Sequence, residues 1–168
     1  MTAAVTAVLS IGSNLGDRET TIRDAVREIA ALPGIDLIAA STLVETPALK
    51  PEGVDYDAPA YLNATIVVAT TQGPEALLAL LNAIEHDHGR VRDVHWGDRT
   101  LDIDIVTMGG ARQATDRLTL PHPRASDRAF VLVPWLEIEP DAVLPGIGRI
   151  DALPAAHESV RRYRAEAL

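Results

Sequence analysis

The chain has 168 residues, the size of one ordinary domain, so we expect a single domain over residues 1–168. Hydrophobic residues make up 47% and charged residues 23%, which is typical of globular proteins and excludes collagen, coiled coil and disorder. There is no cysteine, which excludes disulfides and thiolate-bound metals, and the formal net charge of -9 disfavours nucleic-acid binding. No apolar run approaches the ~18 residues that span a bilayer, and no basic flank precedes the first apolar stretch. We therefore expect a cytoplasmic protein without membrane contact.

The first half of the chain predicts a strand, a helix and two further strands. Residues 4–11 are mostly apolar and rich in β-branched residues, and a turn cluster separates them from a helical pattern that begins at Arg18 and stops at Pro33 and Gly34. Further strands are expected over 35–44 and 61–70. Between them, the prolines, the glycine and the carboxylates of segment 46–59 predict a loop without regular structure, and its length is typical of functional loops.

The second half predicts one more helix and strand before an appended C-terminal part. Gly73 and Pro74 begin a helix that runs through His88, with Gly89 as its stop, and residues 101–108 alternate as a half-buried strand. The resulting order of strand, helix, strand, strand, helix, strand is that of the split βαβ architecture. We predict an α+β fold with a ferredoxin-like (βαββαβ) core, an antiparallel sheet with its helices on one face, and C-terminal extensions.

Two aspartates, Asp102 and Asp104, alternate with apolar residues in the last predicted strand. Successive side chains of a strand point to opposite faces, so both carboxylates project from the same face. Their repulsion costs of order 1 kcal/mol in water and several in a partly buried site, and a hard divalent cation reverses it. Taken alone, the pair is equally compatible with the solvated outer face of an edge strand.

Three arginines, Arg90, Arg92 and Arg99, lie just before this acidic pair. Guanidinium groups bind phosphate oxygens, and a magnesium ion on the aspartates would bind the same phosphates from another side. A lysine-dependent phosphate loop is excluded, because Lys50 is the only lysine. The alternative is a surface loop whose arginines pair with carboxylates of this acidic protein.

Four other residues are candidates for ligand contact. Tyr61 and Asn63 share one strand face, and the Asn63 amide offers a donor and an acceptor to a heteroaromatic ring. Phe130, the only phenylalanine, is a candidate stacking surface, and His122, held between two prolines, is a candidate phosphate contact. For the strand and aromatic residues, the alternative is an ordinary packing or edge role.

A series of short sequence blocks follows in a fixed order from the first predicted strand through at least Pro145. The blocks are Ile11-Gly12-Ser13-Asn14-Leu15-Gly16, Thr46-Pro47, Tyr61-Leu62-Asn63, Glu85 with Gly89-Arg90-Val91-Arg92, Trp96-Gly97 with Arg99-Thr100-Leu101-Asp102-Ile103-Asp104-Ile105, and Leu120-Pro121-His122-Pro123-Arg124 with Arg128-Ala129-Phe130. Together they resemble the 6-hydroxymethyl-7,8-dihydropterin pyrophosphokinase family of folate biosynthesis. An ordered series is far more specific than any single block.

The resemblance implies transfer of the β,γ-pyrophosphoryl group of ATP to the hydroxymethyl group of the pterin, with release of AMP. It also implies a ferredoxin-like fold, two Mg²⁺ ions bound with ATP, and two mobile loops, 46–59 and 90–96, that close over the substrates. The pterin pocket it implies consists of Thr46, Pro47, Leu49, Tyr61, Asn63, Trp96 and Phe130. The implied metal ligands are Asp102 and Asp104, which with Arg90 and Arg99 form the catalytic set, and the implied ATP contacts are Glu85, Arg90, Arg99, His122 and Arg128. No residue stands out as a general base.

The chain departs from the family pattern in two places. Val44 stands where a tyrosine is often found, and the loop that follows Pro47 is long and acidic. In the segment before Trp96, Asp93 and His95 stand where a further basic side chain is common. These departures concern how many cationic groups hold the triphosphate.

Two other classes of protein account for part of the sequence. A ferredoxin-like regulatory module that only binds a small ligand explains the order of elements, but gives no reason for an acidic pair beside arginines. A nucleotidyltransferase explains the acidic pair, but it attacks the α-phosphorus of ATP and releases pyrophosphate. The expected partners are ATP and 6-hydroxymethyl-7,8-dihydropterin, and we expect a monomer.

Overall fold

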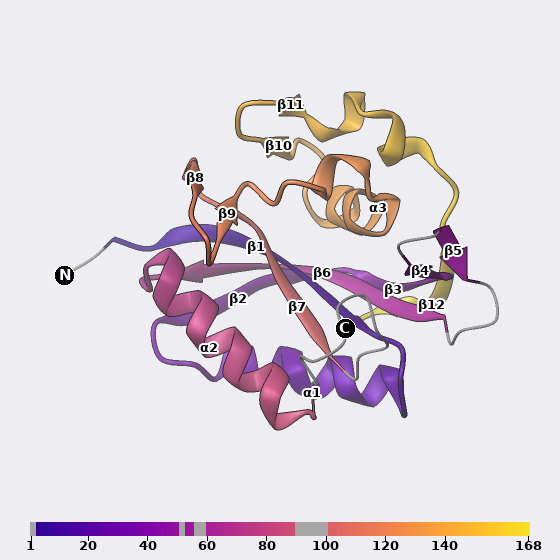
Figure 1. The fold of residues 1–168 in the computed structure, drawn as a ribbon, viewed down its shortest axis with the longest axis horizontal. Helices are drawn as coiled ribbons and strands as arrows, with labels where there is room; N and C mark the ends of the chain where they lie inside the picture. The colour runs from indigo at the N-terminus through magenta and orange to yellow at the C-terminus, as the bar shows by residue number, and fades with distance from the viewer. Residues whose placement is uncertain (1–2, 51–52, 56–59, 90–100) are drawn as a thin grey trace.

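The structure is a computed structural model that describes residues 3–50, 53–55, 60–89 and 101–168. Within these residues, a six-stranded sheet crosses the middle of the molecule (Figure 1). Its strands follow the order β12-β3-β6-β1-β7, and β2 pairs with the remaining part of β6. Every pair in the sheet is antiparallel, so the predicted antiparallel sheet within a mixed α/β fold is confirmed. The strands are β1 (Val5–Ser13), β2 (Ile35–Ala40), β3 (Thr42–Thr46), β6 (Tyr61–Thr70), β7 (Asp102–Met108) and β12 (Arg161–Ala167).

The register of the three central strands aligns polar residues in rows across the sheet. Gly12 of β1 lies opposite Asn63 of β6 on one side and opposite Asp102 of β7 on the other. Two residues earlier in β1, Ser10 lies opposite Thr65 of β6 on one side and opposite Asp104 of β7 on the other. Directly opposed residues of neighbouring strands project from the same face. The sheet therefore gathers Asn63, Asp102 and Asp104 on one face.

Two helices, α1 (Arg18–Ala30) and α2 (Pro74–Asp87), cover the other face of the sheet. Helix α1 begins where the Asp17 side chain accepts a hydrogen bond from the Thr20 N–H, and α2 begins with Pro74 at its first turn. Their buried positions recur at helical spacing and pack against alternate residues of β1, β6 and β7. The buried helix residues are Ile22, Ala25, Val26 and Ile29 in α1, and Leu77, Leu81, Ile84 and Glu85 in α2.

The third helix, α3 (Ala129–Ile138), packs on the opposite face together with the C-terminal part of the chain (Figure 1). Val8, Val67 and Val106 of the sheet form a second core with Leu132 and Trp135 of α3. The Trp135 Nε1–H donates to the Glu139 carboxylate at 2.7 Å, which satisfies the polar atom of a buried indole. The short 3₁₀ helices η1 (Ala125–Asp127), η2 (Ile150–Ala152) and η3 (Pro154–His157) and the hairpin of β10 (Val143–Leu144) and β11 (Gly148–Arg149) complete this layer.

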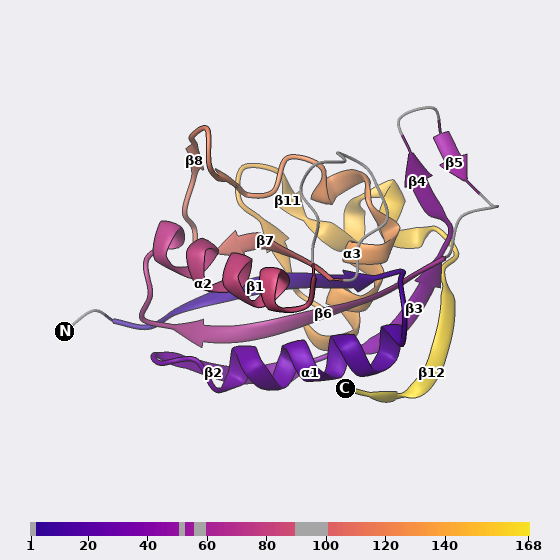
Figure 2. The same ribbon diagram turned by 60° about the horizontal axis from the view of Figure 1, so that its bottom comes forward.

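The prediction that segment 46–59 has no regular structure is wrong. It contains an antiparallel hairpin of β4 (Ala48–Lys50) and β5 (Gly53–Asp55), which projects from the end of β3 (Figure 2). Pro47 precedes the first of these strands, and Gly53, whose φ is 123°, begins the second. Pro47 therefore lies outside the hairpin strands, and Gly53 is tolerated as the first residue of one of them.

The strand expected over 35–44 is divided at Ser41, and its second part continues to Thr46. The Ser41 hydroxyl accepts a hydrogen bond from the Thr65 N–H at 2.9 Å, while the Ser41 N–H donates to the Thr65 carbonyl. Because a side chain takes the place of a backbone acceptor here, the regular pairing shifts.

Strand β12 pairs with β3, although the sequence indicated only a charged C-terminal stretch, and Figure 2 shows this strand running beside β3. A small hairpin of β8 (Gln113–Ala114) and β9 (Thr119–Leu120) follows β7. Among the described residues, no helix is both long and apolar enough to cross a membrane.

Candidate functional site

The candidate site lies at one end of the sheet face that α3 covers. Asp102 and Asp104 project from this face, while Ile103 between them is buried in the core beneath α1 and α2. Both aspartates are partly exposed, and the Asp104 side chain is 33% exposed. The strand therefore presents two carboxylates side by side at an accessible surface, as the alternating sequence predicted.

A cationic side chain and an imidazole approach Asp104 from the segment that leads into α3. The Nη1 atom of Arg128 lies 3.8 Å from the Asp104 Oδ2 atom, and the Nε2 atom of His122 lies 3.9 Å from the same oxygen. The backbone N–H of His122 donates to the Val106 carbonyl at 2.8 Å, which fixes this segment against β7. The fold thus places His122 and Arg128, two predicted ATP contacts, next to Asp104, a predicted metal ligand.

His122 is neutral at pH 7. Burial lowers its pKa to about 4, and the nearby Arg128 guanidinium acts in the same direction, against the opposing influence of Asp102. The Arg124 N–H donates to the Nδ1 atom at 3.2 Å, so the proton of the neutral ring belongs on Nε2. Its contact with Asp104 is consequently not an ion pair at neutral pH, and the Nε2–H can donate to an anionic oxygen.

Arg128 also connects the acidic pair to the aromatic ring of Phe130. The guanidinium carbon lies 5.5 Å from the ring centroid, within the range of a cation–π contact. Phe130 is partly exposed at the first turn of α3. A predicted stacking surface and a predicted phosphate contact therefore touch each other.

Asn63 has a fixed orientation next to Gly12. Its Nδ2–H donates to the Thr46 Oγ1 atom at 3.2 Å, and only 5% of Asn63 is exposed. A Cβ atom on Gly12 would lie 2.6 Å from the Asn63 Oδ1 atom and 3.5 Å from a ring carbon of Tyr61. Any larger residue at position 12 would force the Asn63 amide to move, because the amide lies directly over the β1 backbone.

The sequence interpretation missed this role of Gly12, which it assigned to a turn. The structure places Gly12 within β1, where a glycine inside a strand pattern is a recognised signal of close approach. Val44, one of the departures from the family pattern, lies opposite Asn63 and is buried.

Glu85 is wholly buried in the last turn of α2. Its Oε2 atom accepts a hydrogen bond from the backbone N–H of Ile103 at 2.8 Å. Ile103 separates the two aspartates in the sequence, so Glu85 contacts the strand behind them. The predicted contact of Glu85 with ATP stays a prediction.

Several predicted site residues lie outside the described residues, namely Arg90, Trp96 and Arg99, together with Arg92. Leu49 lies in β4, while Thr46 ends β3 and Pro47 follows it. Thr46 lies beside Asn63 and Tyr61, and the roles of Leu49 and Pro47 stay predictions.

The acidic pair is chemically suited to Mg²⁺. Carboxylate oxygens are hard ligands, and Mg²⁺ is typically bound by one or two carboxylates with waters and substrate phosphates supplying the remaining ligands. Among the described residues no group of three or more His, Asp or Glu side chains forms a metal cluster. Asp102 and Asp104, with Arg128 and His122 beside Asp104, fit a cation that also binds phosphate oxygens, because the same surface offers carboxylates to the cation and N–H donors to the phosphate.

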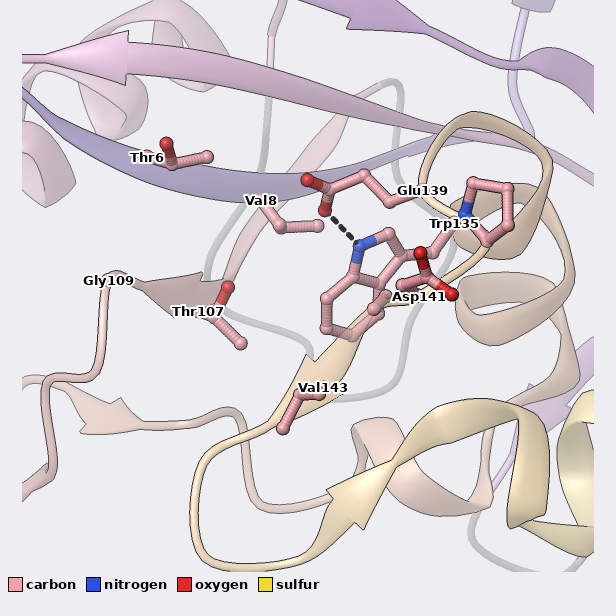
Figure 3. Close-up of a pocket in the computed structure, with 10 residues that line it drawn as sticks. Thr6, Val8, Thr107, Gly109, Trp135, Glu139, Asp141 and Val143 are labelled. Carbon is pink, nitrogen blue, oxygen red and sulfur yellow. Dashed lines mark hydrogen bonds between the residues drawn. The ribbon is translucent and has the colours of Figure 1, made fainter.

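A separate cavity of about 460 Å³ lies toward the other end of β1 (Figure 3). Thr6, Val8 and Thr107 of the sheet line one side, and Trp135 and Glu139 line the other. The cavity includes none of the predicted site residues, and the Glu139 carboxylate already accepts from Trp135. It lies between the sheet and the end of α3 with the segment that follows it.

Comparison with known proteins identifies similarity over most of the chain. Residues 8–140 match the family model of 7,8-dihydro-6-hydroxymethylpterin-pyrophosphokinase. A 2-amino-4-hydroxy-6-hydroxymethyldihydropteridine pyrophosphokinase of Methylorubrum extorquens is 44% identical over 140 residues, which cover 83% of this chain and 86% of that protein. The protein of the same name from Haemophilus influenzae is 38% identical over 141 residues, covering 84% of this chain and 86% of its own.

Solved structures with a similar fold include a Plasmodium falciparum HPPK-DHPS with pterin and p-hydroxybenzoate. The TM-score is 0.68 at 16% identity, and the match covers 90% of this chain and 43% of that one. The wild-type protein of the same organism with pteroate gives a TM-score of 0.69 at 15% identity, covering 90% of this chain and 42% of its own. The chain thus spans about two fifths of these longer proteins. At such identities, the likeness shows the fold alone.

Proposed function

Because the chain belongs to the 7,8-dihydro-6-hydroxymethylpterin-pyrophosphokinase family, we propose that it carries out that family's reaction on the sheet face of Asn63, Asp102 and Asp104. The reaction transfers a pyrophosphoryl group from ATP to hydroxymethyldihydropterin in folate biosynthesis. The oxygen of the hydroxymethyl group forms a bond to the β-phosphorus, and the bond between the α- and β-phosphates breaks to release AMP. The observation that carries the assignment is the strand register, which aligns Asn63, Gly12 and Asp102 in one row.

We propose that Asp102 and Asp104 hold two Mg²⁺ ions together with ATP. When bound, the ions neutralise phosphate charge and orient the triphosphate. The two aspartates need no third protein ligand for this, since ATP and water supply the others. This donor set supports magnesium over softer metals.

Arg128 and His122 are proposed to bind phosphate oxygens beside the aspartates. Arg128 supplies fixed positive charge, and the neutral His122 donates through its Nε2–H. Arg90 and Arg99 are proposed to add further guanidinium groups. Charge neutralisation and positioning are the main requirements when an alcohol attacks phosphorus through a loose transition state.

The pterin is proposed to bind next to Asn63, whose orientation is fixed before any ligand arrives. A preorganised amide loses little conformational freedom on binding, which favours recognition of the edge of a flat heteroaromatic ring. Phe130 and Trp96 are proposed to stack on the ring faces. The remaining proposed contacts are Thr46, Pro47, Leu49 and Tyr61.

We also assign the core to the ferredoxin-like class, and we propose a monomeric cytoplasmic enzyme. The strand order β3-β6-β1-β7, with α1 and α2 on one face, supports the fold assignment. The absence of cysteine and the net charge of -9 are compatible with a reducing compartment and with small-molecule substrates.

Removal of magnesium tests the proposed metal role. We expect EDTA to abolish turnover of ATP and pterin, and excess Mg²⁺ to restore it, because the triphosphate charge is then neutralised again. The measurement is AMP formation before EDTA, after EDTA and after added Mg²⁺. Circular dichroism on the same samples serves as the control, since two surface aspartates are not expected to hold the fold together. Full turnover in EDTA would contradict the metal assignment.

A further inference from the structure

We propose that Glu85 is a positioning residue that sets the arrangement of the two metal-binding aspartates through the backbone of β7. The inference rests on the proposed function, because it concerns the same acidic pair. It assigns Glu85 a role behind the strand, away from the substrates. Its basis is the hydrogen bond that its carboxylate accepts from the Ile103 N–H, between Asp102 and Asp104.

The contact lies at a position where the strand needs a partner. Strand β7 ends the order β12-β3-β6-β1-β7, so within the described residues one of its edges pairs with no long strand of this sheet. The N–H groups along such an edge require acceptors. Helix α2 supplies one at Ile103, over 2.8 Å, from a side chain with no exposed surface.

The placement of Glu85 is unfavourable for the helix itself. A carboxylate in the last turn faces the negative end of the helix dipole, and burial penalises its charge. A leucine at this position would suit both the helix and the surrounding core. A carboxyl oxygen, however, can accept the Ile103 N–H, which a leucine side chain cannot. The hydrogen bond to the Ile103 N–H therefore explains an acidic residue at this position better than the stability of the helix does.

Ile103 is consequently fixed from three directions. Its side chain is buried in the core, its backbone is in register with Ile11 of β1, and its N–H is bonded to Glu85. Asp102 and Asp104 are covalently attached on either side of this residue. A fixed backbone at Ile103 therefore fixes the directions in which the two carboxylates project. Groups that hydrogen-bond or hold metal ligands from behind commonly orient those ligands in this way.

The experiment compares Glu85→Gln with Glu85→Leu, and uses Glu75→Gln on the exposed side of α2 as the matched control. Glutamine keeps an acceptor oxygen for the Ile103 N–H, whereas leucine removes it. The readouts are amide hydrogen exchange at Ile103, binding of Mn²⁺ in the presence of a non-hydrolysable ATP analogue, and the KM values for both substrates.

For Glu85→Leu we expect about a tenfold or greater loss of Ile103 protection and of Mn²⁺ affinity, with an unchanged KM for the pterin. Glu85→Gln should retain Ile103 protection and stay within about fivefold of the parent in Mn²⁺ affinity. Glu75→Gln should match the parent throughout.

A direct ATP contact would give a different pattern. Both Glu85 variants would then raise the KM for ATP equally, with Ile103 still protected, and that result would overturn the proposal. If Glu85→Leu does not fold, the proposal is tested with Glu85→Gln alone. Tenfold weaker Mn²⁺ binding by that variant, with the Ile103 amide still protected, would also overturn the proposal. Absence of AMP formation by the parent protein would refute the proposed function, whereas the Ile103 exchange test remains measurable.

Discussion

Asp102→Asn and Asp104→Asn are each expected to lower kcat/KM by about a thousandfold or more while leaving the fold intact. Asparagine has nearly the same shape as aspartate, so packing is preserved. Each substitution nevertheless removes half of the negative charge that is proposed to hold the metal ions. The aspartates are partly exposed, and neither belongs to the hydrophobic cores, so little stability depends on them.

The measurement is kcat/KM at saturating Mg²⁺, accompanied by thermal unfolding of each variant. Asp116→Asn, an exposed aspartate between β8 and β9, is the matched control and should behave as the parent. Activity within tenfold of the parent for both active-site variants would refute their assignment as metal ligands.

Gly12→Ala is expected to weaken pterin recognition more than ATP recognition. The new Cβ atom would lie 2.6 Å from the Asn63 Oδ1 atom, so the amide must leave its position over β1. The adjustment should raise the KM for the pterin on the order of tenfold or more, because a misplaced polar group loses its hydrogen bonds to the ligand. Overpacking of this kind also costs about 1–3 kcal/mol of the free energy of unfolding.

Steady-state kinetics with each substrate varied in turn separates these effects. Gly110→Ala is the matched control, because a Cβ atom there meets nothing within 4 Å. Thr46→Val, which removes the acceptor of the Asn63 N–H but keeps the side-chain shape, should shift the pterin KM in the same direction by a smaller factor. An unchanged pterin KM in Gly12→Ala would contradict the proposed role of Asn63.

Local signals explain why the helices could be predicted from the sequence. Asp17 caps α1, Pro74 begins α2, and Gly89, with a φ of 82°, follows its end. Each of these residues affects only the backbone a few positions away in the sequence. Its effect can therefore be predicted without knowledge of the fold. The hairpin β4–β5 was missed because the prolines, the glycine and the carboxylates of segment 46–59 were interpreted as excluding regular structure, whereas Gly53 is itself the first residue of β5 and pairs with Lys50.

The shared face of Asp102 and Asp104 also followed from the sequence, since it needs only the two-residue period of a strand. The approach of Arg128 and His122 to Asp104 did not, because it depends on the path of the chain after β9. The contact of Asn63 with Gly12 likewise depends on the register between β1 and β6. Register between distant strands is set by the whole core, which no local pattern reports.

The pairing of β12 with β3 illustrates the same limit. Residues 161–167 are mostly polar or charged, so they lack the alternation that marks a half-buried strand. The end of the chain is held instead by the Leu168 side chain, which packs on the core, and by its N–H, which donates to the Ser41 carbonyl at 3.2 Å. Such an anchor becomes apparent only when the sheet edge is known.

The nucleotide released from ATP tests the central claim most directly, because the position of phosphorus attack determines it. With purified protein, Mg²⁺, ATP and 6-hydroxymethyl-7,8-dihydropterin, we predict equal amounts of AMP and pterin diphosphate, separated and quantified by chromatography, and neither product when the pterin is omitted. ADP as the nucleotide product would indicate attack at the γ-phosphorus, and pyrophosphate with a nucleotidyl-pterin would indicate attack at the α-phosphorus. Either of these results would contradict pyrophosphoryl transfer at the site of Asp102 and Asp104.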